Sequence, residues 1–81
     1  MDTRFDSEDE FRKFAADLKR QRSRIQIRVT ENLLVHKFFV YIYRWCKDFP
    51  GGAWDREGYF VTKERKVAMK LYELEGEGQD D

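Results

Sequence analysis

Apolar and polar residues follow a helical period near the start of the chain. Between Phe11 and Leu18 the apolar side chains recur every three or four positions, with acidic residues before them and basic residues after them. Ser7 and Glu10 form the pattern of a capping box, which satisfies free amides of a first helical turn. The charges also suit the helix macrodipole. The pattern predicts a helix over residues 7–20.

The segment 24–30 alternates strictly between polar and apolar residues. Its apolar members are Ile25, Ile27 and Val29, and arginines and a glutamine lie between them. A period of two is typical of a strand with one buried face. The alternation predicts a strand here, and a second short strand is predicted over residues 58–62, Gly-Tyr-Phe-Val-Thr.

The aromatic residues are concentrated in one segment, where nine of the thirteen fall between Phe38 and Phe60. Aromatic and β-branched residues favour strands, so both periods have to be tested. On a helical wheel, most apolar residues of the first part share one broad arc, and most charged residues lie opposite. A strand would place Arg44 in line with apolar neighbours. The wheel favours a helix over residues 32–48 that ends at Pro50-Gly51-Gly52.

The segment 63–74 is rich in strong helix formers and is predicted as a helix. Its basic start and acidic end oppose the helix macrodipole. A strand that pairs with residues 58–62 in a hairpin therefore remains an alternative.

The predicted fold is a small two-layer α+β domain over residues 7–75, in the order helix, strand, helix, strand, helix. Its two strands would be parallel and joined by a right-handed crossover. Because two strands make a marginal sheet, a third strand or pairing across a homodimer would complete it. Residues 1–6 are expected to be a flexible N-terminus, and residues 76–81 a disordered acidic tail.

Composition indicates one globular domain, with 41% hydrophobic and 40% charged residues and a net charge of zero. The charges are sorted along the chain: five acids and one base in residues 1–11, seven bases and one acid in residues 12–28, and five acids in residues 73–81. A single cysteine excludes an internal disulfide. No apolar stretch is long enough to span a bilayer. We therefore expect a cytoplasmic protein with no membrane partner.

Catalytic chemistry has few candidate residues. His36 and Cys46 are the only histidine and cysteine, so neither residue type can supply a second ligand for a zinc site. Phosphate-binding and nucleotide-binding glycine motifs are absent from the sequence. The acidic residues fall in runs that helix capping explains. The sequence predicts a protein that is not an enzyme and has no metal and no cofactor.

The C-terminal half carries a family resemblance over residues 45–72. It consists of Trp45-Cys46 with Phe49, then Trp54-Asp55, Tyr59-Phe60-Val61 and Ala68-Met69-Lys70-Leu71. This order resembles the ending of short uncharacterised bacteriophage accessory proteins, although a closing tryptophan is missing. The resemblance implies a phage or mobile-element protein in the cytoplasm of an infected bacterial host, and it transfers no catalytic residue.

A protein partner is the first binding hypothesis. If residues 32–48 form a helix, its outer side carries an aromatic and aliphatic centre with a basic rim, a composition typical of interface hot spots. The candidate partner-binding residues are His36, Val40, Tyr43, Arg44 and Lys47. Together with the resemblance, they predict an accessory protein that binds a host protein or defence complex and inhibits it. A virion or assembly component is a further alternative.

Nucleic acid is the alternative partner. The basic stretch from Arg20 to Arg28 includes the strand predicted at residues 24–30, and arginines beside an exposed aromatic ring on an open sheet suit phosphates and stacked bases. The candidate residues are Lys19, Arg20, Arg22, Arg24, Arg28 and Phe60. Phe60 is expected to point outward, with Tyr59 and Val61 pointing inward.

Overall fold

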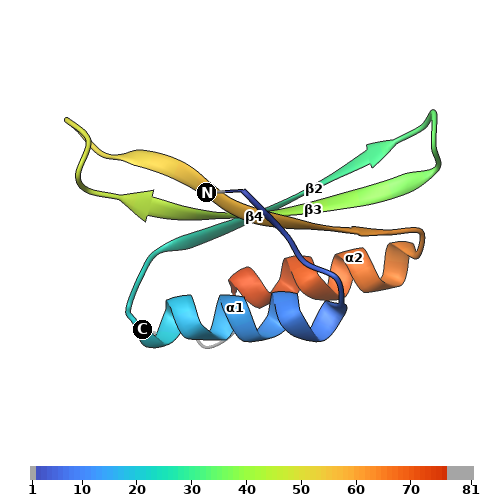
Figure 1. Cartoon of the computed structure of the whole chain (residues 1–81), viewed down its shortest axis with the longest axis horizontal. Helices are drawn as coiled ribbons and strands as arrows, with labels where there is room; N and C mark the ends of the chain where they lie inside the picture. The colour runs from blue at the N-terminus through green and yellow to red at the C-terminus, as the bar shows by residue number, and fades with distance from the viewer. Residues whose placement is uncertain (1, 77–81) are drawn as a thin grey trace.

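The sheet of this protein has four strands, and both helices cover the same face of it (Figure 1). The computed structural model describes residues 2–76. Its elements are β1 (Thr3–Arg4), α1 (Glu8–Arg20), β2 (Ile25–Asn32), β3 (Lys37–Cys46), β4 (Ala53–Thr62), α2 (Arg65–Tyr72) and a 3-10 turn, η1 (Glu73–Glu75). The predicted α+β class is confirmed, but the predicted order of elements is wrong.

The strands lie in the order β1-β4-β3-β2. β2, β3 and β4 are consecutive antiparallel partners, and β1 pairs with β4 in parallel. The two strands predicted from sequence, β2 and β4, run in the same direction as expected, but they do not pair, because the antiparallel β3 lies between them where a crossover helix was predicted. Short turns join β2 to β3 and β3 to β4, and such turns connect only antiparallel strands.

Residues 32–48 form β3 and the ends of its neighbouring turns, so the predicted helix here is wrong. Val40 and Ile42 are buried under the helices, whereas Tyr41 and Tyr43 point to the opposite face. Because both faces of this central strand are apolar, the strand lacks the polar alternation that would separate it from a helix. Arg44 is accommodated beside Ile42 by an ion pair with Glu57 at 3.4 Å.

The glycines that were expected to end a helix form the β3–β4 turn instead. Gly51 and Gly52 have φ angles of +78° and +79°, which strongly favour glycine. A Cβ on Gly52 would lie 2.1 Å from the Trp45 ring. The turn therefore requires glycine for both its backbone conformation and its packing.

The first helix begins as the sequence predicts. Ser7 Oγ accepts a hydrogen bond from the Glu10 amide at 3.2 Å, and Glu10 accepts one from the Asp6 amide at 3.3 Å. The prediction of a helix over 63–74 is also confirmed, because α2 and the 3-10 turn that follows occupy this segment. The alternative hairpin with residues 58–62 is wrong.

The core lies between the sheet and the two helices. Its centre consists of side chains from α1, β2, β3 and α2 that are almost completely buried, namely Phe11, Ile27, Val40, Ile42 and Leu71. All these residues lie on the face of the sheet that the helices cover. The other face of the sheet carries neither helix, and this arrangement places the candidate site.

The N-terminal segment is part of the fold, contrary to the flexible residues 1–6 that we expect from sequence. β1 adds a parallel edge strand to β4, and Phe5 is buried against Phe11 with ring centroids 5.6 Å apart. The burial of Phe5 explains the order of this segment. Of the acidic tail expected to be disordered over 76–81, Gly76 caps the 3-10 turn with its amide donating to the Glu73 carbonyl at 3.2 Å, and residues 77–81, like Met1, lie outside the described residues.

Gly58 allows β1 to approach β4 closely. A Cβ at this position would lie 2.5 Å from the Thr3 carbonyl oxygen and 2.6 Å from the Phe5 ring. We expect Gly58→Ala to lower the free energy of unfolding by about 1–3 kcal/mol, because β1 and Phe5 must move apart. Urea unfolding measures the change. Gly76→Ala is the matched control, since nothing lies within 4 Å of its Cβ position; an equal loss in both variants would contradict the packing argument.

Candidate functional site

The face of the sheet that points away from the helices is defined by the strand register. Tyr41 lies beside Arg28 on one neighbouring strand and beside Tyr59 on the other. Residues at alternate positions share this side, which we call the open face. It carries Arg24, directly before β2; Gln26, Arg28 and Thr30 of β2; Phe39, Tyr41, Tyr43 and Trp45 of β3; and Trp54, Arg56, Tyr59 and Val61 of β4.

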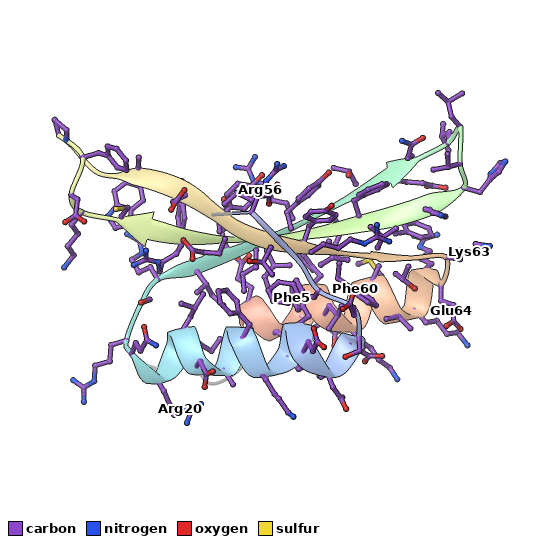
Figure 2. The ribbon with its side chains drawn as sticks, in the orientation of Figure 1. Phe5, Arg20, Arg56, Phe60, Lys63 and Glu64 are labelled. Carbon is purple, nitrogen blue, oxygen red and sulfur yellow. The ribbon has the colours of Figure 1, made fainter. Side chains whose placement is uncertain are left out.

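The side-chain view shows the same separation into two faces. Arg56 lies on the side of the sheet away from the helices, and Phe5 and Phe60 lie between the sheet and the helices (Figure 2). The open face is therefore composed mainly of aromatic rings and polar side chains, and the buried hydrophobic core lies on the other side.

The aromatic rings of the open face form a continuous strip. Tyr41 is its centre, with ring centroids 6.3 Å from Phe39, 6.5 Å from Tyr43 and 6.2 Å from Tyr59. The rings are half-buried because they pack against one another. Each side chain is thus held in place by its neighbours and still reaches solvent.

A pair of tryptophans lies at the end of the open face nearest the β3–β4 turn. Trp45 and Trp54 are cross-strand partners, and their rings meet edge to face with centroids 5.2 Å apart. Gly52 provides the space beside the Trp45 ring. The turn therefore helps to fix the position of this pair.

Arginines lie directly over these rings. The guanidinium of Arg56 is 5.0 Å from the Tyr41 ring centroid, and that of Arg28 is 5.6 Å from Tyr43. Arg24 is 5.8 Å from the rings of both Trp45 and Trp54. Cations within about 6 Å of a ring are attracted to its π-face. The open face thus alternates positive charges with aromatic surface.

Arg56 has one acidic partner, Asp2, at 2.8 Å. This hydrogen bond is the main cause that raises the pKa of Arg56 above its ordinary value. Arg56 is thus positively charged at neutral pH, and its exposed side chain can exchange Asp2 for another anion.

Acidic residues of the strands occupy the helix-covered side of the sheet. Glu31 is the cross-strand partner of Phe38, and Asp55 is that of Arg44. Further acids lie on α1 and in the 3-10 turn. Because α1 carries as many basic as acidic residues and α2 carries three basic ones, the helical layer is not acidic. The sorting of charge concerns the strands, whose acids lie on the side opposite Arg28 and Arg56.

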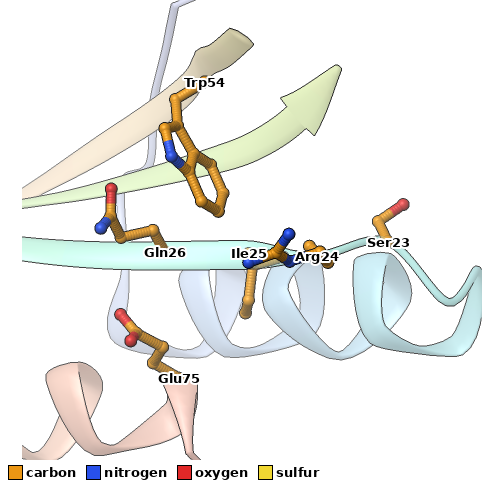
Figure 3. Close-up of a pocket in the computed structure, with 6 residues that line it drawn as sticks. All are labelled: Ser23, Arg24, Ile25, Gln26, Trp54 and Glu75. Atoms are coloured by element: carbon orange, nitrogen blue, oxygen red, sulfur yellow. The ribbon is translucent and has the colours of Figure 1, made fainter. Parts of the chain in front are cut away.

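A polar cavity of about 340 Å³ continues the open face around the start of β2 (Figure 3). Its lining residues are Ser23, Arg24, Ile25, Gln26, Trp54 and Glu75. Glu75 accepts a hydrogen bond from the Ile27 amide at 2.7 Å, which satisfies an outward-facing group of this edge strand. The amide oxygen of Gln26 accepts from Arg28 at 3.2 Å, so its NH₂ group can donate to a ligand.

The predicted partner-binding residues do not form one surface. Val40 is completely buried, and Tyr43 lies on the open face. Arg44 pairs with Glu57, while His36 lies in the β2–β3 turn and Lys47 in the β3–β4 turn. These residues were grouped on a helix that does not exist, so the proposed hot spot loses its geometric basis.

The predicted nucleic-acid residues divide into two groups. Arg24 and Arg28 lie on the open face as predicted. The others lie elsewhere: Lys19 donates to the Leu74 carbonyl, Arg20 pairs with Asp17, Arg22 lies in the loop after α1, and Phe60 packs against the core.

Phe60 points to the helices, so its predicted outward orientation is wrong. Its cross-strand partner is the buried Val40, whereas Tyr59 and Val61 face outward. A change of one position in a strand reverses every side chain. The strand prediction over 58–62 is correct. Because residues 32–48 were predicted as a helix, no neighbouring strand fixed which residues of 58–62 face the core.

Four residues of the open face were not predicted as site residues, namely Tyr41, Trp45, Trp54 and Arg56. A signal was present in the alternation of aromatic residues at 39, 41, 43 and 45. Trp54 and Arg56 lie outside the strand predicted over 58–62, which covers only the second half of β4.

No protein-family model matches the chain, and comparisons with curated proteins and with solved structures give no significant match. Within residues 2–76, no group of three or more His, Cys, Asp or Glu side chains could hold a metal ion. None of the helices in this part of the chain has the length and hydropathy to cross a bilayer. Fold and site define a small α+β protein whose sheet has one face of aromatic and arginine side chains.

Proposed function

We propose that this protein binds single-stranded nucleic acid across the open face of its sheet. The observation that carries the proposal is the set of three arginines placed within 6 Å of aromatic rings, with Arg56 over Tyr41, Arg28 over Tyr43 and Arg24 over the tryptophan pair. Bases stack on such rings, and the arginines neutralise phosphates.

Single strands fit this face better than a duplex. A sheet presents a broad surface of ring faces and edges, and unpaired bases can be splayed out onto it. In a duplex the base faces are stacked on one another, so the rings would have no partner. The arginines alone would then provide weak contacts to phosphates.

The charge distribution supports a polyanionic partner over a neutral one. An apolar protein surface would leave Arg24, Arg28 and Arg56 in a desolvated interface, which is costly without matching acids. Phosphates supply these negative charges along the whole strand. Binding should therefore weaken as salt increases, because counterions are released from the strand.

Fluorescence anisotropy with a labelled single strand of about 12 nucleotides, a length within the usual range for small sheet domains, tests the proposal. We expect binding at low salt, and weaker binding to the corresponding duplex. Tyr41→Ala should lower the affinity about 10- to 100-fold, since one stacked base contributes about 1–3 kcal/mol.

Phe49→Ala is the matched control, because this half-exposed ring lies in the β3–β4 turn and is not one of the cross-strand residues of the open face. Its affinity should equal that of the wild type. Absence of binding to any single strand would refute the proposal, as would equal losses in both variants. Modulation of a host protein and a role in virion assembly stay predictions from the sequence.

A further inference from the structure

The β2–β3 turn presents three consecutive aliphatic residues to solvent. Leu33, Leu34 and Val35 are 71%, 92% and 49% exposed, and we call them the tip. Turns are usually built from glycine, asparagine, aspartate, proline or serine. Three successive exposed apolar residues are unfavourable in a free surface unless they serve a function.

The tip has a defined local structure. The Leu34 amide donates to Asn32 Oδ1 at 3.0 Å, and His36 closes the turn with a φ of 52°. Asparagine side chains commonly hold turns in this way. The aliphatic side chains are thus projected from an ordered hairpin end.

An apolar groove of about 500 Å³ lies beside the same hairpin. Val29 and Phe38 form its floor, and Met69 and Tyr72 of α2 form its wall. Met69 and Tyr72 are 42% and 44% exposed, so the groove opens to solvent. Glu31 and Arg65 complete its lining with one negative and one positive charge.

The tip and the groove form one continuous surface. Glu31 and Phe38 are cross-strand partners, one pair before the last pair of the hairpin, Asn32 and Lys37. The groove therefore begins where the tip ends. The tip residues do not line the groove and stay exposed, so the single molecule does not bury the tip in its own groove.

We propose that a second copy of this chain occupies this surface, with each tip inserted into the groove of its partner. A two-fold dimer uses the same self-complementary patch on both copies, and an apolar projection next to an apolar groove is such a patch. Glu31 of each copy would face Arg65 of the other across the axis. The net charge of zero adds no general repulsion between copies.

A lipid surface or a nucleic acid fits this surface less well. Lipid would cover the tip but leave the groove unfilled, and phosphates would meet only aliphatic groups at the tip. Exchange of tips fills both features at once. This inference is independent of the open face, because the groove lies on the helix-covered side of the sheet.

Sedimentation equilibrium of the full chain tests the dimer. We expect a reversible monomer–dimer equilibrium for the wild type, and a shift of at least tenfold toward monomer for Leu34→Asp. Met69→Glu should have the same effect, because it places a charge in the groove. Phe49→Asp is the matched control, since it adds the same charge to an exposed apolar residue in the other turn.

Mixing the Leu34→Asp and Met69→Glu chains distinguishes exchange of tips from other contacts. The first chain keeps its groove and the second keeps its tip, so one of the two contacts can form and a weak heterodimer should appear. A wild type that stays monomeric at every concentration would overturn the inference. Dimers that persist in Leu34→Asp but dissociate in Tyr41→Ala would overturn it too, and would assign self-association to the open face.

Discussion

Replacing Arg28 and Arg56 together by glutamate is expected to lower the affinity for a single strand by about 1,000-fold or more at low salt, since each change removes a phosphate contact and adds a repulsive charge. The two guanidinium groups lie over the neighbouring rings of Tyr43 and Tyr41. The substitution therefore also removes the cations that hold a strand against the central rings.

A charge-matched control separates this effect from a change in total charge. Lys13→Glu with Arg20→Glu alters the net charge equally, and both residues are exposed on α1. We expect this control to lose less than tenfold in affinity, because screening limits distant charges. The slope of log affinity against log salt should fall by about two in the Arg28 and Arg56 variant. Equal losses in both double variants would show that general attraction, and no defined face, governs binding.

The sequence was informative where only one face of an element is buried. α1 has an apolar stripe and a capping box, and β2 begins with three buried or half-buried apolar residues that alternate with polar ones. In both elements the period of the pattern follows directly from the burial of one side. These two elements were therefore predicted with nearly correct bounds.

β3 could not be predicted in this way, because it is the central strand and is apolar on both sides. Its fully buried helix-facing residues, Val40 and Ile42, are aliphatic, and its open-face residues are aromatic, while Phe38 and Arg44 also face the helices. A binary pattern treats these two classes as the same, so the alternation disappears. From Phe39 to Trp45 aromatic positions alternate with non-aromatic ones, and this alternation contains the missing period.

The wrong prediction for β3 affects only part of the candidate site. Arg24 and Arg28 were predictable, because β2 carries its own alternation. Arg56 and the tryptophan pair depend on β3 and on the register of β4, where the pairing shifts between Ile42 and Tyr43. Such a shift cannot be read from a single strand, so half of the open face required the structure.

Substitutions at two neighbouring residues on β4 test which of its side chains face the helices and which lie on the open face. Phe60→Ala should lower the free energy of unfolding by about 3 kcal/mol, because its ring packs against the core. The folded protein should keep its affinity for a single strand. Tyr59→Ala should instead lower the affinity about 10- to 100-fold through loss of a stacked base, with a smaller loss of stability.

Urea unfolding and anisotropy on the same two variants provide both measurements, with binding analysed below the unfolding transition. Each variant is the matched control for the other, because both truncate one aromatic ring at adjacent positions of one strand. The reverse result, with affinity lost in Phe60→Ala and stability lost in Tyr59→Ala, would require a register shifted by one residue. That shift would place Phe60 in solvent and Tyr59 and Val61 under the helices, which the packing of Phe60 against the core opposes. The stability of these two variants therefore tests the register of the sheet, and their affinity tests the function of its open face.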